Sequence, residues 1–179
     1  MPWLIWLKKL PQMKKKVLNN MLISTNEILF RIKKALSLSI EEMINAYTLE
    51  EYKMEPSYLE SLLKRRQDDG FMLCTYEELG LFLDGLVTLK RGPSPKKKSE
   101  AEAVELTNNL ILKKLRIALE LKESETEIIF GLADIELSKQ QLASLFRKEG
   151  HKNFKACSDE LLMAFLEGLD EFYYTGEEI

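Results

Sequence analysis

The chain has 179 residues, of which 45% are hydrophobic and 31% charged, and its formal net charge at pH 7 is −3. This is the composition of an ordinary soluble globular protein, with enough residues for one large or two small domains. Two cysteines and no secretion signal exclude a disulfide framework and predict a cytoplasmic protein, and the acidic balance restricts any nucleic-acid contact to local basic patches.

Residues 1–24 form a basic N-terminal extension, which we expect to be poorly ordered. Residues 1–26 carry five lysines and no acidic side chain. The apolar run from Pro2 to Leu7 is too short to span a bilayer, and Pro11 interrupts any helix there. We therefore predict no membrane crossing and no membrane partner.

The remainder of the chain is an internal duplication. Residues 26–86 align with residues 109–169 at a constant offset of 83 without a gap, and about 19 of the 61 aligned positions are identical. The identical pairs include Asn26 and Asn109, Cys74 and Cys157, and Gly85 and Gly168. A repeat of about 65 residues is marginal on its own. We expect the two copies to pack on each other through apolar faces in a pseudo-two-fold arrangement.

Each repeat has helical periodicity throughout. Between residues 26 and 38 apolar side chains recur every three or four positions, which predicts helix one. Ser39 with Glu42 has the form of a capping box that opens helix two. In the second copy we place this start at Ser124 with Glu127, two residues later than the alignment implies. We expect helix two to end near residues 53 and 136.

Helix three starts at Pro56 in the first repeat and at Ser138, paired with Gln141, in the second. Basic residues at 64–66 and at 147 and 148 would end it, because cations suit the carbonyl end of a helix dipole. Thr75, paired with Glu78, opens helix four in the first repeat, and Ser158 opens it in the second. No strand signal competes, so the predicted fold class is all-α, with two tandem four-helix repeats.

The domain organisation follows from this pattern. Repeat one covers residues 25–89, and repeat two covers residues 107–179. Residues 90–106 form a linker that contains Pro93, Pro95 and three consecutive lysines. Because the prolines stiffen this segment, we expect the two copies to be tethered closely without fusing into one continuous helix.

Four runs of the sequence resemble the YehS-like family of bacterial proteins, and the resemblance covers residues 25 to 169. The runs are NEILFRIKKALSL, FMLCTYEELGLFLDGLVTLKRG, NNLILKKLRIALEL and NFKACSDELLMAFLEGL. The resemblance implies a cytoplasmic bacterial protein built from a tandem duplication of a small all-helical domain of unknown function. It supplies no activity, cofactor or catalytic residue.

We predict no catalytic, cofactor-binding or metal-binding residue. The single histidine, His151, excludes a two-histidine metal site, and no phosphate-binding loop, dinucleotide fingerprint or nucleophile elbow is present. An enzyme remains an alternative, because Cys74 and Cys157 each precede a helix start, where the helix amino terminus lowers the pKa of a thiol. Their repetition in both copies favours a packing role instead.

A second alternative is nucleic-acid binding through a helix-turn-helix-like pair in repeat two. If helix three entered a major groove, its exposed polar residues would meet bases and phosphates, and basic residues of helix one would meet phosphates. These candidate contacts are Lys139, Gln140, Gln141, Ser144, Arg147, Lys148, Lys113, Lys114 and Arg116. In repeat one, Glu55 and Glu60 make the corresponding face acidic.

The leading expectation is a non-enzymatic protein-interaction or scaffold module. Amphipathic helices with acidic faces offer grooves for partner helices. Tyr173 and Tyr174 are candidate anchors, with ordinary packing of a terminal helix as the alternative. The sequence predicts a protein partner but neither its identity nor the oligomeric state of the chain, and nucleic acid is the alternative partner.

Overall fold

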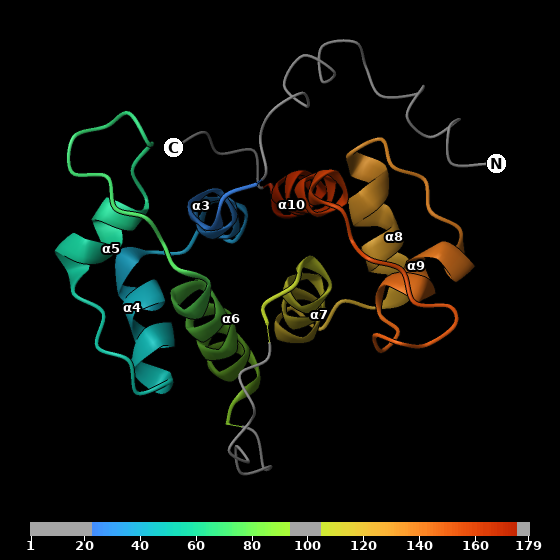
Figure 1. Cartoon of the computed structure of the whole chain (residues 1–179), viewed down its shortest axis with the longest axis horizontal. Coiled ribbons are helices and arrows are strands. Elements are labelled where there is room, and N and C mark those ends of the chain that lie inside the picture. The colour runs from blue at the N-terminus through green and yellow to red at the C-terminus, as the bar shows by residue number, and fades with distance from the viewer. Residues whose placement is uncertain (1–22, 94–104, 175–179) are drawn as a thin grey trace.

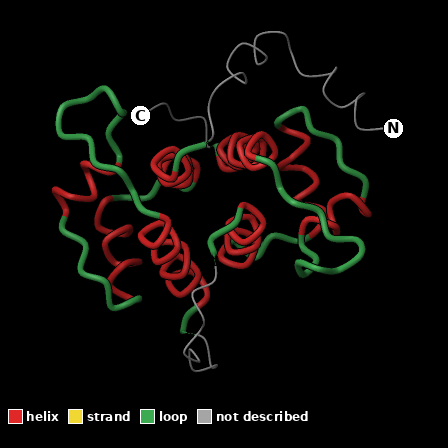
Figure 2. The backbone as a smooth tube through the Cα atoms, in the orientation of Figure 1, coloured by secondary structure: helices red, strands yellow, loops and turns green. Residues whose placement is uncertain are grey.

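The computed structural model describes residues 23–93 and 105–174, and every regular element in these two ranges is a helix (Figures 1 and 2). The first repeat contains α3 (Thr25–Ala35), α4 (Ile40–Leu49), α5 (Pro56–Leu62) and α6 (Tyr76–Arg91). The second contains α7 (Asn108–Ala118), α8 (Glu123–Leu132), α9 (Lys139–Leu145) and α10 (Asp159–Tyr173). The two tandem four-helix repeats are thus present. Nearly all of the N-terminal extension and most of the linker lie outside the described residues.

Helices α3, α6, α7 and α10 occupy the centre of the molecule, where the two repeats pack against each other (Figure 1). Helix α3 packs against α10, and α7 packs against α6. The first helix of each repeat therefore contacts the fourth helix of the other repeat more extensively than the fourth helix of its own. The outer helices are arranged alike, with α4 on α6 and α8 on α10. These equivalent pairings give the pseudo-two-fold relation predicted from the sequence.

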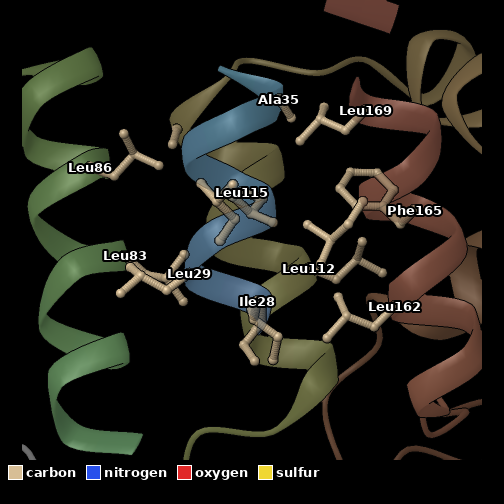
Figure 3. Close-up of a cluster of buried hydrophobic side chains, with 14 of the residues drawn as sticks. Ile28, Leu29, Ala35, Leu83, Leu86, Leu112, Leu115, Leu162, Phe165 and Leu169 are labelled. Carbon is tan, nitrogen blue, oxygen red and sulfur yellow. The ribbon is translucent and has the colours of Figure 1, made fainter. Parts of the chain in front are cut away.

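The central helices share one hydrophobic core (Figure 3). Leu29 of α3, Leu83 of α6, Leu112 of α7 and Leu162 and Phe165 of α10 are all fully buried within it. Fully burying a side chain of this size stabilises a fold by about 1.5–3 kcal/mol. Because the core draws on both repeats, each copy supplies apolar surface that the other needs.

Side chains cap the helix starts largely as predicted. The Ser39 and Glu42 capping box opens α4, and the Ser138 and Gln141 box opens α9. The start at Ser124 with Glu127 is wrong. Helix α8 begins at Glu123, and the main-chain N–H of Lys122 donates a 2.7 Å hydrogen bond to the Glu125 carboxylate. The unshifted alignment gives the correct register, because Lys122 replaces only the serine of the box and the acid remains.

The second helix of each repeat ends earlier than predicted. Helices α4 and α8 end at Leu49 and Leu132, about one turn before the expected positions. Each is followed by a residue in the left-handed region, Glu51 at φ 60° and Asp134 at φ 59°. Such residues reverse the chain and end a helix, and glycine is their usual sequence signal. Neither position is a glycine, so the sequence pattern did not reveal these ends.

Two further boundaries differ from the predictions. Helix three ends at Leu62 and at Leu145, so the basic residues at 64–66 and 147–148 lie beyond it rather than in its last turn. Helix α6 continues to Arg91 and ends at Gly92, whose φ is 81°. Residues 90 and 91, which we expected in the linker, are therefore helical. None of the described helices is long and apolar enough to cross a membrane.

Candidate functional site

Three of the residues predicted to contact nucleic acid have hydrogen-bond or ion-pair partners within the protein. The ammonium group of Lys114 pairs with Asp84 of α6, and the Lys114 side chain is only 18% exposed, so it joins the two repeats. The Gln141 side chain accepts a 2.8 Å hydrogen bond from the main-chain N–H of Ser138. Ser144 donates its hydroxyl to the main-chain carbonyl of Gln141. These contacts stabilise the fold, and the predicted contact of the three residues with nucleic acid stays a prediction.

The other candidates on helix three surround a short helix that faces solvent. Lys139 and Gln140 are exposed at the start of α9, and Arg147 and Lys148 are exposed just beyond its end. Helix α9 is not buried between the repeats. However, it has only 7 residues, and residues 133–138 separate it from α8. A DNA-binding helix-turn-helix uses a turn of 3–4 residues. The pair α8 and α9 departs from that geometry.

The remaining two candidates, Lys113 and Arg116, lie in a depression beside α7. We call this depression of about 470 Å³ the α7 trough. Its lining comes from the end of α6, from α7, from the following turn and from the residue after α9. The lining residues are Arg91, Lys113, Arg116, Ile117, Glu120, Leu121 and Phe146. The trough is open to solvent and lies where the two repeats meet.

The cations of the α7 trough are held in place to different degrees. The Nε–H of Arg116 donates a 3.1 Å hydrogen bond to the main-chain carbonyl of Leu121, and its guanidinium carbon lies 4.5 Å from the ring centre of Phe146. Arg91 forms an ion pair with Glu120. A second depression of about 220 Å³ shares Arg116 and Phe146 with the trough and extends to Arg147.

Sequence reasoning missed Arg91 and Phe146 as members of this site. They lie in different repeats, and neither belongs to a local motif that would have identified it. Only the packing of α6 against α7 brings Arg91 near Arg116. The sequence therefore identified two residues of the trough, through the basic character of helix one, but not the trough itself.

The two cysteines are buried, as a packing role predicts. Burial raises the pKa of the Cys74 and Cys157 thiols to about 12. Both thiols therefore remain protonated near neutral pH, whereas a nucleophilic cysteine must be a thiolate. Each cysteine precedes a helix start as noted from the sequence, but desolvation outweighs any stabilisation of the thiolate by the helix amino terminus.

Repeat one contains a cluster of three tyrosines and one carboxylate, of which Tyr47 and Glu78 are buried and Tyr52 and Tyr58 are half-buried. Glu78 of α6 is buried and accepts hydrogen bonds from the hydroxyls of Tyr52, at 3.2 Å, and Tyr58, at 2.9 Å. It also caps α6 by accepting from the main-chain N–H of Thr75. Burial alone would raise the pKa of Glu78, but these hydrogen bonds outweigh it and hold the pKa below its usual value. The hydroxyl of Tyr47 is buried without a hydrogen-bond partner in the described part of the chain.

The second repeat has no such cluster. The positions of Tyr47, Tyr52 and Glu78 are taken there by Phe130, Ile135 and Leu161. Sequence reasoning missed the cluster because it treated Glu78 as a capping residue alone. A polar residue aligned with an apolar one in the other copy is the signal that could have found it. The hydrogen bonds satisfy Glu78 within the protein, so the cluster contributes to the structure of repeat one.

An exposed apolar segment in repeat one leads into α6 and includes its first residue. Met72, Leu73 and Tyr76 are 48%, 58% and 62% exposed. We call residues 72–76 the apolar segment. Of the two anchors predicted from the sequence, Tyr173 packs edge-on against Phe172 at a ring separation of 5.2 Å, and Tyr174 is exposed.

Hydrogen bonds hold the apolar segment in place. The main-chain N–H of Met72 donates to the carbonyl of Ser61. The amide of Asn26 donates to the carbonyl of Met72 at 2.8 Å, and its oxygen accepts from the N–H of Cys74 at 3.1 Å. The apolar side chains are therefore presented on a backbone that is tied to α3 and α5.

No group of three or more potential ligands for a metal ion occurs in residues 23–93 and 105–174.

The model of a family described as a protein of unknown function (DUF1456) matches the chain twice, over residues 25–92 and 108–173. The uncharacterized protein YehS of Escherichia coli (strain K12) is 31% identical over 149 residues, which cover 81% of this chain and 93% of that protein. No solved structure matches the chain. The two family matches coincide with the two helical repeats, and the chain, which is similar to YehS, belongs to the DUF1456 family.

Proposed function

We propose that the chain is a non-enzymatic, cytoplasmic protein-interaction module that binds a partner protein through the apolar segment of repeat one. The observation that carries this proposal is the exposure of Met72, Leu73 and Tyr76, each about half exposed or more, within five residues. Aromatic and methionine side chains are enriched where proteins bind one another.

The backbone of the apolar segment favours this role. Because Asn26 and Ser61 hold it by hydrogen bonds, little conformational entropy remains to be lost when a partner binds. A flexible loop with the same side chains would pay that cost in full. The apolar segment is in this respect a preorganised contact surface.

The second repeat provides an internal comparison. The positions of Met72, Leu73 and Tyr76 are taken there by Lys155, Ala156 and Asp159. The same backbone and the same asparagine contact are present in both copies, so the fold itself does not require large apolar side chains at these positions. Their presence in repeat one alone supports a role in binding.

The experiment is an affinity capture from a lysate of the producing cell, with and without nuclease, followed by identification of the partner and reconstitution with the purified partner. The variant Leu73→Ser with Tyr76→Ser should reduce binding of the purified partner about tenfold or more. The matched control is Ile128→Ser, because Ile128 is 52% exposed on α8 and lies in the other repeat. Both variants should retain the helical content of the unmodified chain.

Two results would contradict the proposal. A captured partner whose binding is unchanged by the Leu73 and Tyr76 substitutions would place the contact elsewhere. A partner that disappears after nuclease treatment would favour the nucleic-acid alternative.

A further inference from the structure

We propose that the α7 trough binds a nucleotide through its phosphate groups, with Lys113 and Arg116 as the phosphate ligands. This site lies in repeat two and at its junction with repeat one, and it is separate from the apolar segment. The trough would recognise a phosphate group next to a planar base. A free nucleotide and a single-stranded nucleic acid both contain this combination.

The charges of the trough favour an anion. Arg91, Lys113 and Arg116 line it together with one carboxylate, that of Glu120. Glu120 is paired with Arg91. Among the described residues, neither Lys113 nor Arg116 has an ion pair with a carboxylate, so their two positive charges are available to an anion.

Arg116 is held in a defined orientation. Its Nε–H donates a 3.1 Å hydrogen bond to the carbonyl of Leu121, and its guanidinium carbon lies over the Phe146 ring, 4.5 Å from the ring centre. These contacts leave the terminal nitrogens without a partner in the described part of the chain. A guanidinium whose position is fixed loses less entropy when it binds a phosphate, and its two terminal nitrogens suit phosphate oxygens.

The remaining surface of the trough suits a base. Ile117 is 45% exposed, and Phe146 and Leu121 complete an apolar lining. Bases stack on aromatic side chains and on arginine guanidinium planes. The volume of about 470 Å³ lies within the range of roughly 300–1,000 Å³ that small-molecule sites occupy.

The fold does not account for all of these cations. Arg91 and Arg116 lie in the last turns of α6 and α7, where a helix dipole favours positive charge. The pseudo-two-fold relation shows what the fold requires, since the equivalents of Arg91, Lys113 and Arg116 are Tyr174, Phe30 and Lys33. Only one of the three positions carries a cation in both copies. The two additional cations are specific to the trough.

The test measures binding of ADP to the full chain by titration calorimetry, with adenosine, inorganic phosphate and a single-stranded oligonucleotide as further probes. We expect ADP to bind and adenosine to bind at least about tenfold more weakly, because it lacks the phosphates. Tighter binding of the oligonucleotide than of ADP would identify nucleic acid as the source of the phosphate. Tighter binding of ADP would identify a free nucleotide, and either result supports the site.

The variants place the binding in the trough. Lys113→Gln should weaken binding of the preferred probe about tenfold, because it removes one charge-assisted contact from an exposed side chain. Lys33→Gln is the control, since it makes the same substitution at a lysine of repeat one that does not line the trough, and it should leave binding unchanged. The proposal is overturned if neither ADP nor the oligonucleotide binds, if Lys113→Gln binds as well as the unmodified chain, or if Lys33→Gln weakens binding equally.

Discussion

Gly85 of α6 lies directly against the main-chain carbonyl of Ala46 in α4, and a Cβ atom at Gly85 would overlap that carbonyl oxygen. Gly168 of α10 lies in the same way against Ile129 of α8. The absence of a side chain lets the backbones of helix two and helix four touch in both repeats. This close approach explains why glycine occupies both equivalent positions.

Replacing Gly168 with alanine should therefore destabilise the protein by about 3 kcal/mol, because the helices must move apart to accept the methyl group. The matched control is Gly131→Ala in α8, where no atom lies within 4 Å of the added Cβ. Alanine has the higher helix propensity, so the control should stabilise the protein by up to about 1 kcal/mol. Urea unfolding of both variants measures the difference. Equal effects of the two substitutions would contradict the close contact.

Asn109 should contribute as much to the stability of the folded protein as the hydrophobic core residues do. Its side-chain amide donates hydrogen bonds to the carbonyls of Leu145 and Lys155, both at 2.8 Å, and its oxygen accepts from the N–H of Cys157 at 2.8 Å. Asn26 makes the same set of contacts in repeat one. Asn109→Ala should destabilise the protein by roughly 2–4 kcal/mol, because several partly buried groups lose their partners.

The control for this prediction is Asn45→Ala, because Asn45 is exposed on α4. The free energy of unfolding of the Asn45→Ala variant should differ from that of the unmodified chain by less than about 0.5 kcal/mol. Chemical denaturation of the two variants under one set of conditions gives the comparison. A loss for Asn109→Ala no larger than that of the control would show that its hydrogen bonds contribute little.

Stability should fall in alkaline solution because of the buried thiols. In the folded protein the pKa of Cys74 and of Cys157 is raised by burial from 9.0 to about 12. Between these values the unfolded chain loses protons that the folded chain retains. The stabilising contribution is therefore fully present below pH 9 and is lost as the pH rises toward 12.

The measurement is the free energy of unfolding at about pH 8 and at about pH 10, for the unmodified chain and for the double variant Cys74→Ala with Cys157→Ala. The double variant should be less stable at the lower pH because it leaves cavities, but its decline with pH should be shallower. Buried tyrosines add to the decline in both proteins. The prediction would be contradicted if the free energy of unfolding declined equally with pH in the two proteins. Rapid modification of the native thiols by a thiol reagent at the lower pH would likewise show that burial does not keep them protonated.

The effects on stability of substituting Glu78 and of substituting the tyrosines that contact it should be non-additive. Glu78→Leu introduces the repeat-two residue and should cost roughly 2–3 kcal/mol, because the hydroxyls of Tyr52 and Tyr58 and the N–H of Thr75 lose their acceptor. Adding Tyr52→Phe and Tyr58→Phe removes the unpaired hydroxyls. The combined loss should be smaller than the sum of the separate losses by about 1 kcal/mol or more.

Acid unfolding provides a second measurement. Because the pKa of folded Glu78 lies below its unfolded value of 4.5, its contribution is present above that pH and is lost as the pH falls through the folded value. Glu78→Leu should therefore flatten the acid limb of the stability curve. Glu77→Leu, which changes an exposed neighbour, is the control. Glu78 would act only as a helix cap if the stability losses of the Glu78 and tyrosine substitutions were additive. An unchanged dependence of stability on pH in acid for Glu78→Leu would indicate the same.

Local contacts explain which features could be predicted. The starts at Ser39, Thr75 and Ser138 were identified because a capping side chain bonds to a backbone group three residues away. The burial of Cys157 followed from its repetition and from the small, apolar character of a free thiol. The ends of α4 and α8 were not identified, because Glu51 and Asp134 adopt left-handed backbone angles for which their residue types give only weak signals.

The duplication, the all-helical class and most helix starts were determined by the sequence alone, because each depends on residues close together in the chain or on a direct comparison of the two copies. The tertiary structure alone decided that α3 packs against α10 and that α7 packs against α6. The first helices of the two repeats have similar apolar faces, so periodicity does not show which fourth helix each will cover. That choice depends on the difference in packing free energy summed over many side chains distant in sequence. The same packing brings Arg91 near Arg116 and creates the α7 trough.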